Sequence, residues 1–206
     1  MLTYLILGMT YAFAAAVQPG PLQAYTISQT LLHGWRRALP AACSPLLSDG
    51  PIIVLVLLVL SHLPAWLIPA VRLTGGALLL VFAGVAARNW WTFRPGRPTV
   101  AGVPPRSLLG ATAVNLTSPG PYLGWSLVMG PLLLKGWREA PSHGIALLVG
   151  FYGVMVLSMA AIILLAGAAR GLGPRTNRAL IGASALALAG LGMWQLWSWA
   201  ATFPPR

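Results

Sequence analysis

The stretch VQPGPL at residues 17–22 and the stretch TSPGPY at residues 117–122 decide the fold. Each places Pro-Gly-Pro inside a long run of apolar residues. A proline lacks the N–H that a helix needs and clashes with the preceding turn, whereas glycine tolerates backbone angles that other residues avoid. We therefore predict two long helices that are each broken at a Pro-Gly-Pro motif.

The composition indicates that these helices lie in a membrane. The chain has 206 residues, of which 57% are hydrophobic and 7% are charged, against roughly 25% charged residues in an ordinary soluble domain. The mean hydropathy is +0.77. Such a composition excludes a soluble globular protein and a disordered chain. The net charge of +11 does not indicate nucleic-acid binding, because the basic residues lie in short gaps between apolar runs.

Six apolar runs predict an all-α membrane protein with six transmembrane helices in a single domain, residues 1–206. The runs cover about residues 2–32, 38–60, 66–90, 107–134, 141–169 and 177–200. Nine arginines fall in the first, third and fifth loops, and four basic residues fall on the opposite side. Because positive loops face the cytoplasm, we expect both the N- and C-termini to lie outside.

The two halves of the chain repeat each other. Pro119-Gly120-Pro121 follows Pro19-Gly20-Pro21 by 100 residues, and a Gly-Trp-Arg at 136–138 follows one at 34–36 by 102 residues. The pattern R-x3-G-x7-G-x6-W begins at Arg72 and again at Arg178, 106 residues later. We assign repeat one to about 1–94, a linker to about 95–106 and repeat two to about 107–201. Since three spans are an odd number, the repeats must be inverted, as in many secondary transporters.

Matching breaks in two inverted repeats predict a binding site halfway across the membrane. Each half-helix that begins after a break would direct N–H groups and about +0.5 of dipole charge at a substrate carboxylate. Polar side chains near the breaks either bind substrate or satisfy freed backbone groups. The candidate substrate-binding residues are Gln18, Pro19, Gly20, Pro21, Asp49, Asn115, Ser118, Pro119, Gly120 and Pro121.

Asp49 is the most informative candidate, because it is one of two acids in the chain and lies inside the second apolar run. An ionised carboxylate at bilayer depth costs about 2.5–3.5 kcal/mol on insertion scales. Asp49 is therefore expected to pair with an ammonium group or to carry a proton, unless it only pairs with polar neighbours. No paired acids, catalytic motif or metal-ligand spacing is present in the sequence, so we expect no enzymatic activity, no metal and no cofactor.

These motifs resemble those of the lysine exporter (LysE/RhtB-type) family over essentially the whole chain. The resemblance is carried by Pro19-Gly20-Pro21, Gly34, Asp49-Gly50 and the Gly75-Gly76…Gly84 helix. The family's N-x-x-N-P-K motif is matched at Asn115 and Pro119, whereas Ser118 replaces its second asparagine and Gly120 its lysine. The departures indicate a divergent branch.

The resemblance implies a multi-pass protein of the bacterial inner membrane that exports a small amino acid or a related zwitterion, driven by the proton-motive force. The expected partners are this small molecule and the lipid bilayer, and small-residue helix faces leave a homo-oligomer open. Two alternatives remain: a transporter of another cargo, such as a cation or a lipid-linked compound, on the same fold, and a non-transporting membrane scaffold subunit.

Overall fold

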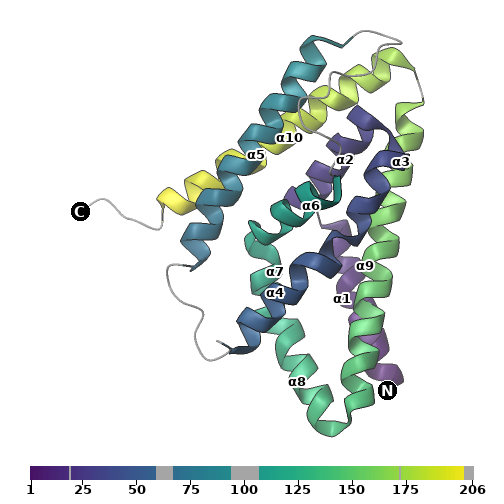
Figure 1. Cartoon of the computed structure of the whole chain (residues 1–206), viewed down its shortest axis with the longest axis vertical. Coiled ribbons are helices and arrows are strands. Elements are labelled where there is room, and N and C mark those ends of the chain that lie inside the picture. Colours follow the sequence, from purple (N-terminus) through teal and green to yellow (C-terminus); the bar gives the residue numbers. More distant parts are fainter. Residues whose placement is uncertain (19, 59–66, 94–106, 172, 202–206) are drawn as a thin grey trace.

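The computed structural model describes residues 1–18, 20–58, 67–93, 107–171 and 173–201, and every regular element within these ranges is a helix (Figure 1). The elements are α1 (Leu2–Val17), α2 (Pro21–His33), α3 (Trp35–Ala38), the 3₁₀-helix η1 (Leu39–Cys43), α4 (Ser44–Leu58), α5 (Leu67–Trp91), α6 (Ser107–Leu116), α7 (Pro119–Gly124), the π-helix η2 (Trp125–Met129), α8 (Gly130–Glu139), α9 (Pro141–Arg170) and α10 (Pro174–Ala200). Two predicted features, Pro19 and the linker at about 95–106, lie outside the described residues.

Four helical stretches in the described part of the chain are long and apolar enough to cross a membrane: Trp35–Val56, Arg72–Trp91, Pro141–Arg170 and Pro174–Ala200. The bent pair of α1 and α2, whose axes differ by 62°, makes a fifth if it is one span. The predicted run at 107–134 is divided among α6, α7, η2 and α8, and each of these is far shorter than the roughly 20 residues of a span. The chain is therefore an all-helical protein with four or five candidate spans among the described residues.

Two long helix pairs frame the molecule (Figure 1). In one pair α5 packs along α10, and in the other α1 packs along α9. The shorter helices lie between the pairs, where α2 contacts both α9 and α10, and α4 contacts α6. The helices on the far side of each break, α2 and α7, therefore lie between the long helix pairs.

Glycines allow α1 and α9 to approach closely. A Cβ added at Gly8 would collide with the carbonyl oxygen of Leu147, and one added at Gly150 would collide with that of Leu5. Small residues at such contacts are typical of membrane helices, whose association depends on close backbone packing. The pairing of α1 with α9 therefore depends on the missing side chains at these two positions.

The ends of the helices gather at two opposite ends of the molecule. Trp90, near the end of α5, lies under the guanidinium of Arg178 in the first turns of α10, 5.5 Å from ring centroid to Cζ. A Cβ at Gly34, which ends α2, would lie 2.8 Å from Nη1 of Arg170 at the end of α9. At the other end, Tyr4 stacks on His143 with 5.0 Å between ring centroids. Thus α2, α5 and α9 end together, whereas α1 and α9 begin together at the opposite end.

The Gly-Trp-Arg match is not mirrored in the local structure. Gly34 closes α2 with a φ of 88°, in the region that favours glycine, and the chain turns there into α3. Its predicted counterpart Gly136 lies inside α8. The two Gly-Trp-Arg triplets therefore occupy a turn in one half of the chain and a continuous helix in the other.

Candidate functional site

The first break separates α1 from α2 at the position predicted from the sequence. Gln18 leaves α1 in an extended conformation with φ −66° and ψ 123°, and Gly20 precedes α2 with φ −157° and ψ 179°. Pro21 is the first residue of α2, a position where proline is favoured because its missing N–H would have no partner within the helix.

The second break lies before its Pro-Gly-Pro motif, which corrects the prediction that the helix breaks at the motif itself. The helix ends at Leu116, and Ser118 is extended with φ −100° and ψ 133°. Pro119, Gly120 and Pro121 then form the first turn of α7. The physical reason is again the preference of proline for the first helical turn: the motif starts a helix instead of interrupting one.

The glycines of both motifs have a different role from the one predicted. Gly20 is extended and Gly120 is helical, and neither has the positive φ that only glycine adopts easily. A Cβ added at Gly120 would have no heavy atom within 4 Å. Gly120 therefore leaves space open at the break rather than enabling a special backbone conformation.

Polar side chains satisfy the carbonyl groups that the breaks release. At the first break, Nε2 of Gln23 donates to the carbonyl oxygens of Ala15 and Ala16 at 3.2 and 3.0 Å. At the second, two hydroxyl groups donate to released carbonyl oxygens of α6: Ser118 to Val114 at 2.6 Å and Tyr122 to Leu116 at 2.7 Å. The hydroxyl of Thr117 adds a bond of 2.8 Å to the carbonyl oxygen of Ala113, which also accepts the Thr117 N–H. One of the two roles predicted for these polar residues, the satisfaction of freed backbone groups, is therefore present in the structure.

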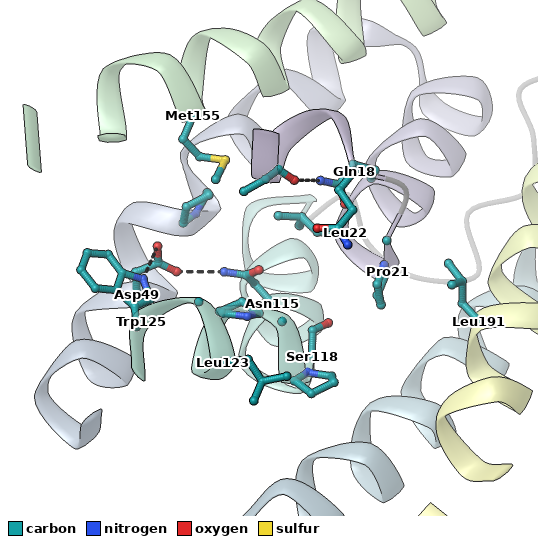
Figure 2. A pocket seen from close by; sticks show the side chains of 18 of the residues that line it. Gln18, Pro21, Leu22, Asp49, Asn115, Ser118, Leu123, Trp125, Met155 and Leu191 are labelled. Carbon is teal, nitrogen blue, oxygen red and sulfur yellow. Dashed lines mark hydrogen bonds between the residues drawn. The ribbon is translucent and has the colours of Figure 1, made fainter. Parts of the chain in front are cut away.

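Asp49 lies buried on α4, with 3% of its surface exposed, and accepts hydrogen bonds from distant parts of the chain (Figure 2). Nδ2 of Asn115 donates to Oδ1 at 3.1 Å, and Nε1 of Trp125 donates to Oδ2 at 3.3 Å. Ser48 donates a longer hydrogen bond of 3.4 Å to Oδ1 and accepts one of 2.7 Å from Asn115. The single hydroxyl proton of Ser48 is shared with the carbonyl oxygen of Ser44 at 2.9 Å. A carboxylate has about four lone-pair sites, so at least one acceptor position on Asp49 stays free.

The donor Trp125 begins the π-helix η2, a wider turn inserted between α7 and α8. Its ring is 2% exposed and meets the ring of Phe151 edge-on, with 5.3 Å between centroids. Phe151 in turn contacts Tyr152 and Tyr11 with centroid distances of 5.1 and 6.2 Å. Single-turn π-helices are frequent at functional sites, and this one presents the indole N–H to the carboxylate.

A cavity of about 350 Å³ lies beside Asp49 between the two breaks (Figure 2). Nine of the ten predicted site residues line it, and the tenth, Pro19, lies outside the described residues. Those nine are Gln18, Gly20, Pro21, Asp49, Asn115, Ser118, Pro119, Gly120 and Pro121. The structure therefore brings together residues from two segments that are about one hundred positions apart in the sequence.

The cavity wall also includes residues that were not among the ten candidates, some from the same helices and some from α1, α9 and α10. These lining residues are Tyr11, Ala15, Leu22, Gln23, Pro45, Leu123, Gly124, Trp125, Phe151, Met155, Leu191, Trp194 and Gln195. Most are apolar or aromatic and could not be told from core residues by pattern. Gln195 differs, because it is a polar side chain within a long apolar run, the same signal that singled out Asp49. No group of three or more metal-ligating side chains occurs among the described residues.

Comparison with known proteins identifies the family. The sequence profile described as LysE type translocator matches residues 13–196, which include both breaks and the whole cavity lining except Tyr11. No curated protein and no solved structure matches the chain. Together with the candidate spans, the profile match makes this chain a multi-pass membrane protein of a transporter family. The chain belongs to the LysE type translocator family.

Proposed function

We propose that this protein is a secondary transporter that exports a small amino acid or a related zwitterionic metabolite. The observation that carries the proposal is a buried carboxylate, Asp49, which faces a cavity between two helix breaks and is held by Asn115 of the second half of the chain. A buried acid at membrane depth is costly and therefore marks a functional site.

The cavity suits a molecule of this size. Its volume of about 350 Å³ lies at the lower end of the range of roughly 300–1,000 Å³ for small-molecule sites. Leu22, Leu123 and Met155 provide apolar surface for a side chain, whereas Asp49 provides the charge. This combination favours an amino acid with an apolar side chain.

The two charged ends of a zwitterion would find different partners. The free acceptor position on Asp49 suits an ammonium group. The N–H groups of Leu22 and Gln23 lie in the first turn of α2, where an α-helix leaves its N–H groups without an intrahelical partner. In α7 the prolines at 119 and 121 leave Gly120 as the N–H donor of that segment. Around the cavity, α2 therefore offers the carboxylate of the cargo more free N–H groups than α7 does.

Asp49 would also couple cargo export to proton movement. In this mechanism Asp49 binds a proton and an ammonium-bearing cargo in alternation, so that inward proton movement drives export. The cargo would reach each side as the two broken segments rock around the cavity. Asn115 and Trp125 orient the carboxylate in the state described here. Because both belong to the broken segment that would move against α4, these two hydrogen bonds would change as the cavity opens to the other side.

Contacts between α5 and α10 support the inverted repeat. A Cβ at Gly76 would meet Leu196, and a Cβ at Gly182 would meet Trp90. Gly182 follows Gly76 by 106 positions, and Leu196 follows Trp90 by the same number. This is also the offset between the patterns that begin at Arg72 and Arg178. A two-fold axis that exchanges the halves maps one contact onto the other. On this basis we propose six spans, with α1–α2 and α6–α8 each forming one broken span.

The clustering of helix ends supports the predicted orientation. The end of the molecule where α2 and α9 finish carries Arg36, Arg37 and Arg170, and α10 begins there with Arg175 and Arg178. Because positive residues favour the cytoplasmic side, we propose that this end faces the cytoplasm of a bacterial inner membrane. Both termini would then lie outside.

Counterflow in liposomes tests the proposal. Purified protein is reconstituted with a panel of labelled amino acids, and exchange is compared between wild type, Asp49→Asn and Glu139→Gln. Glu139 is the matched control, since it is the other acid of the chain and its side chain is 44% exposed beside His143. We expect exchange of at least one apolar amino acid by wild type and Glu139→Gln, and its loss in Asp49→Asn. Equal exchange by all three proteins would contradict the role of Asp49.

An imposed pH gradient separates coupling from binding. Wild-type protein should accumulate the exchanged amino acid when the gradient is applied and should stop when an uncoupler removes it. If wild type exchanges none of the panel, the choice of amino acids as cargo is wrong, and the same liposomes can be loaded with cations to test the alternative cargo.

A further inference from the structure

A second buried polar side chain faces the cavity and has no partner. Gln195 on α10 is 1% exposed, and neither its Nε2 nor its Oε1 has a hydrogen-bond partner among the described residues. Buried polar groups in proteins are almost always hydrogen-bonded, because they have given up their bonds to water. An unpaired amide in a cavity wall is therefore available to bond a molecule that enters the cavity.

Gln195 contributes to the cavity from a different side than Asp49. The cavity is lined by both residues, and Figure 2 shows Leu191 of α10 on the side of the cavity opposite Asp49. A Cβ added at Gly75 would collide with Oε1 of Gln195 and with the carbonyl oxygen of Thr117. The amide therefore lies against the backbone of α5 beside the second break, which restricts its movement.

The other buried amides of the chain explain why Gln195 is exceptional. Asn115 donates to Asp49, and Asn89 donates from Nδ2 to the carbonyl oxygen of Val85 at 2.9 Å. Asn89 is also the residue 106 positions before Gln195, so it is its counterpart in the proposed repeat. Asn177 has an unpaired Oδ1 but does not line the cavity. Gln195 thus combines complete burial, two unpaired polar atoms and access to the cavity.

We infer that Gln195 is a specificity-determining residue that binds the carboxylate of an amino-acid cargo while Asp49 binds its ammonium group. The inference rests on the proposed function. An amide nitrogen carries two N–H donors, and hydrogen bonds to a charged acceptor are stronger than those between neutral groups. Because the amide is neutral, it adds carboxylate recognition without pairing with Asp49. An analogue that lacks the carboxylate leaves the amide unpaired and therefore binds less tightly than the amino acid.

Two probe pairs test this assignment: L-leucine against 3-methylbutylamine, and L-phenylalanine against 2-phenylethylamine. In each pair the amine is the amino acid without its carboxylate. Half-saturation concentrations are measured by competition in counterflow for wild type, Gln195→Met and the control Asn89→Leu, which removes a buried amide away from the cavity. We expect Gln195→Met to raise the half-saturation concentration for the amino acids about ten-fold and to change that for the amines less than two-fold.

The outcomes separate the two proposals. If Gln195→Met weakens amino acids and amines equally, or weakens neither, the assignment of the carboxylate to Gln195 is wrong. If the amines do not compete for wild-type protein, Gln195→Asn is measured instead. This variant keeps an amide and should recover part of the affinity for L-leucine that Gln195→Met loses. Absence of any recovery overturns the inference. If wild type exchanges no amino acid of the panel, the proposed function fails, whatever the variants do.

Discussion

Asn115 donates a hydrogen bond to Asp49 across 66 positions of sequence, with 3.1 Å between Nδ2 and Oδ1. It joins α6, just before the second break, to α4 in the first half of the chain. The bond thus couples the geometry of a break directly to the one buried charge of the described cavity lining.

Replacing Asn115 with leucine removes this donor and leaves Asp49 with two hydrogen bonds. We expect the free energy of unfolding to fall by about 1–3 kcal/mol, since a buried acceptor loses its partner. We also expect exchange of the cargo to fall at least ten-fold. Thermal unfolding in detergent and counterflow in liposomes measure the two effects. In the double variant with Asp49→Asn the stability losses should not add, because the residues are in direct contact; additive losses would mean that the bond has no energetic importance.

Replacing Gln23 should lower stability and replacing Gln18 should not, although both side chains line the cavity. Gln23 donates to two carbonyl oxygens released by the first break, so Gln23→Met should lower the free energy of unfolding by about 1–3 kcal/mol. Gln18 is exposed, so Gln18→Met should change stability by less than about 0.5 kcal/mol while reducing exchange. Chemical unfolding and counterflow on both variants check this. Equal destabilisation by the two substitutions would contradict it.

Gly120 should control the size of the accepted cargo. Gly120 lines the cavity, and a methyl group added there meets no heavy atom within 4 Å. We therefore expect Gly120→Ala to retain or slightly raise stability, because alanine favours helices by up to about 1 kcal/mol over glycine. Exchange of L-leucine should fall more than exchange of L-alanine.

The control for this prediction is Gly84→Ala on α5. Gly84 also has no atom within 4 Å of an added Cβ, but it does not line the cavity. Both amino acids should be exchanged by Gly84→Ala as by wild type. A similar loss in both variants would indicate a general effect of alanine in these helices.

The sequence predicts some of these features because they are local. The break at Gln18 to Pro21 follows from the chemistry of proline, and the burial of Asp49 follows from its place in an apolar run. The second break lies before Pro119 because the same chemistry that ends a helix also starts one, and the sequence pattern alone does not choose between these outcomes.

Features that depend on tertiary contacts could not be predicted in the same way. The donors to Asp49 come from Asn115 and Trp125, 66 and 76 positions away, and only packing of α4 against the second half brings them together. The apolar pattern of residues 107–139 does not predict that a π-helix interrupts this stretch. Gln195 was visible as a polar residue in an apolar run, but its unpaired state appears only once its surroundings are known.

The two ends of α9 should lie on opposite sides of the membrane. This helix has 30 residues, and at 1.5 Å per residue it is about 45 Å long, enough to cross a hydrocarbon core of about 30 Å. Glu139 lies just before it and Arg170 is its last residue.

We expect Arg170→Cys to react with a membrane-impermeant thiol reagent only from the cytoplasmic side and Glu139→Cys only from the outside. Both variants require Cys43→Ser, because the native thiol is exposed. In the same background Leu2→Cys, an exposed position near the N-terminus, should react from the same side as Glu139→Cys, since Tyr4 stacks on His143. Labelling of both ends of α9 from one side would contradict the proposed orientation and with it the inverted arrangement of the two halves.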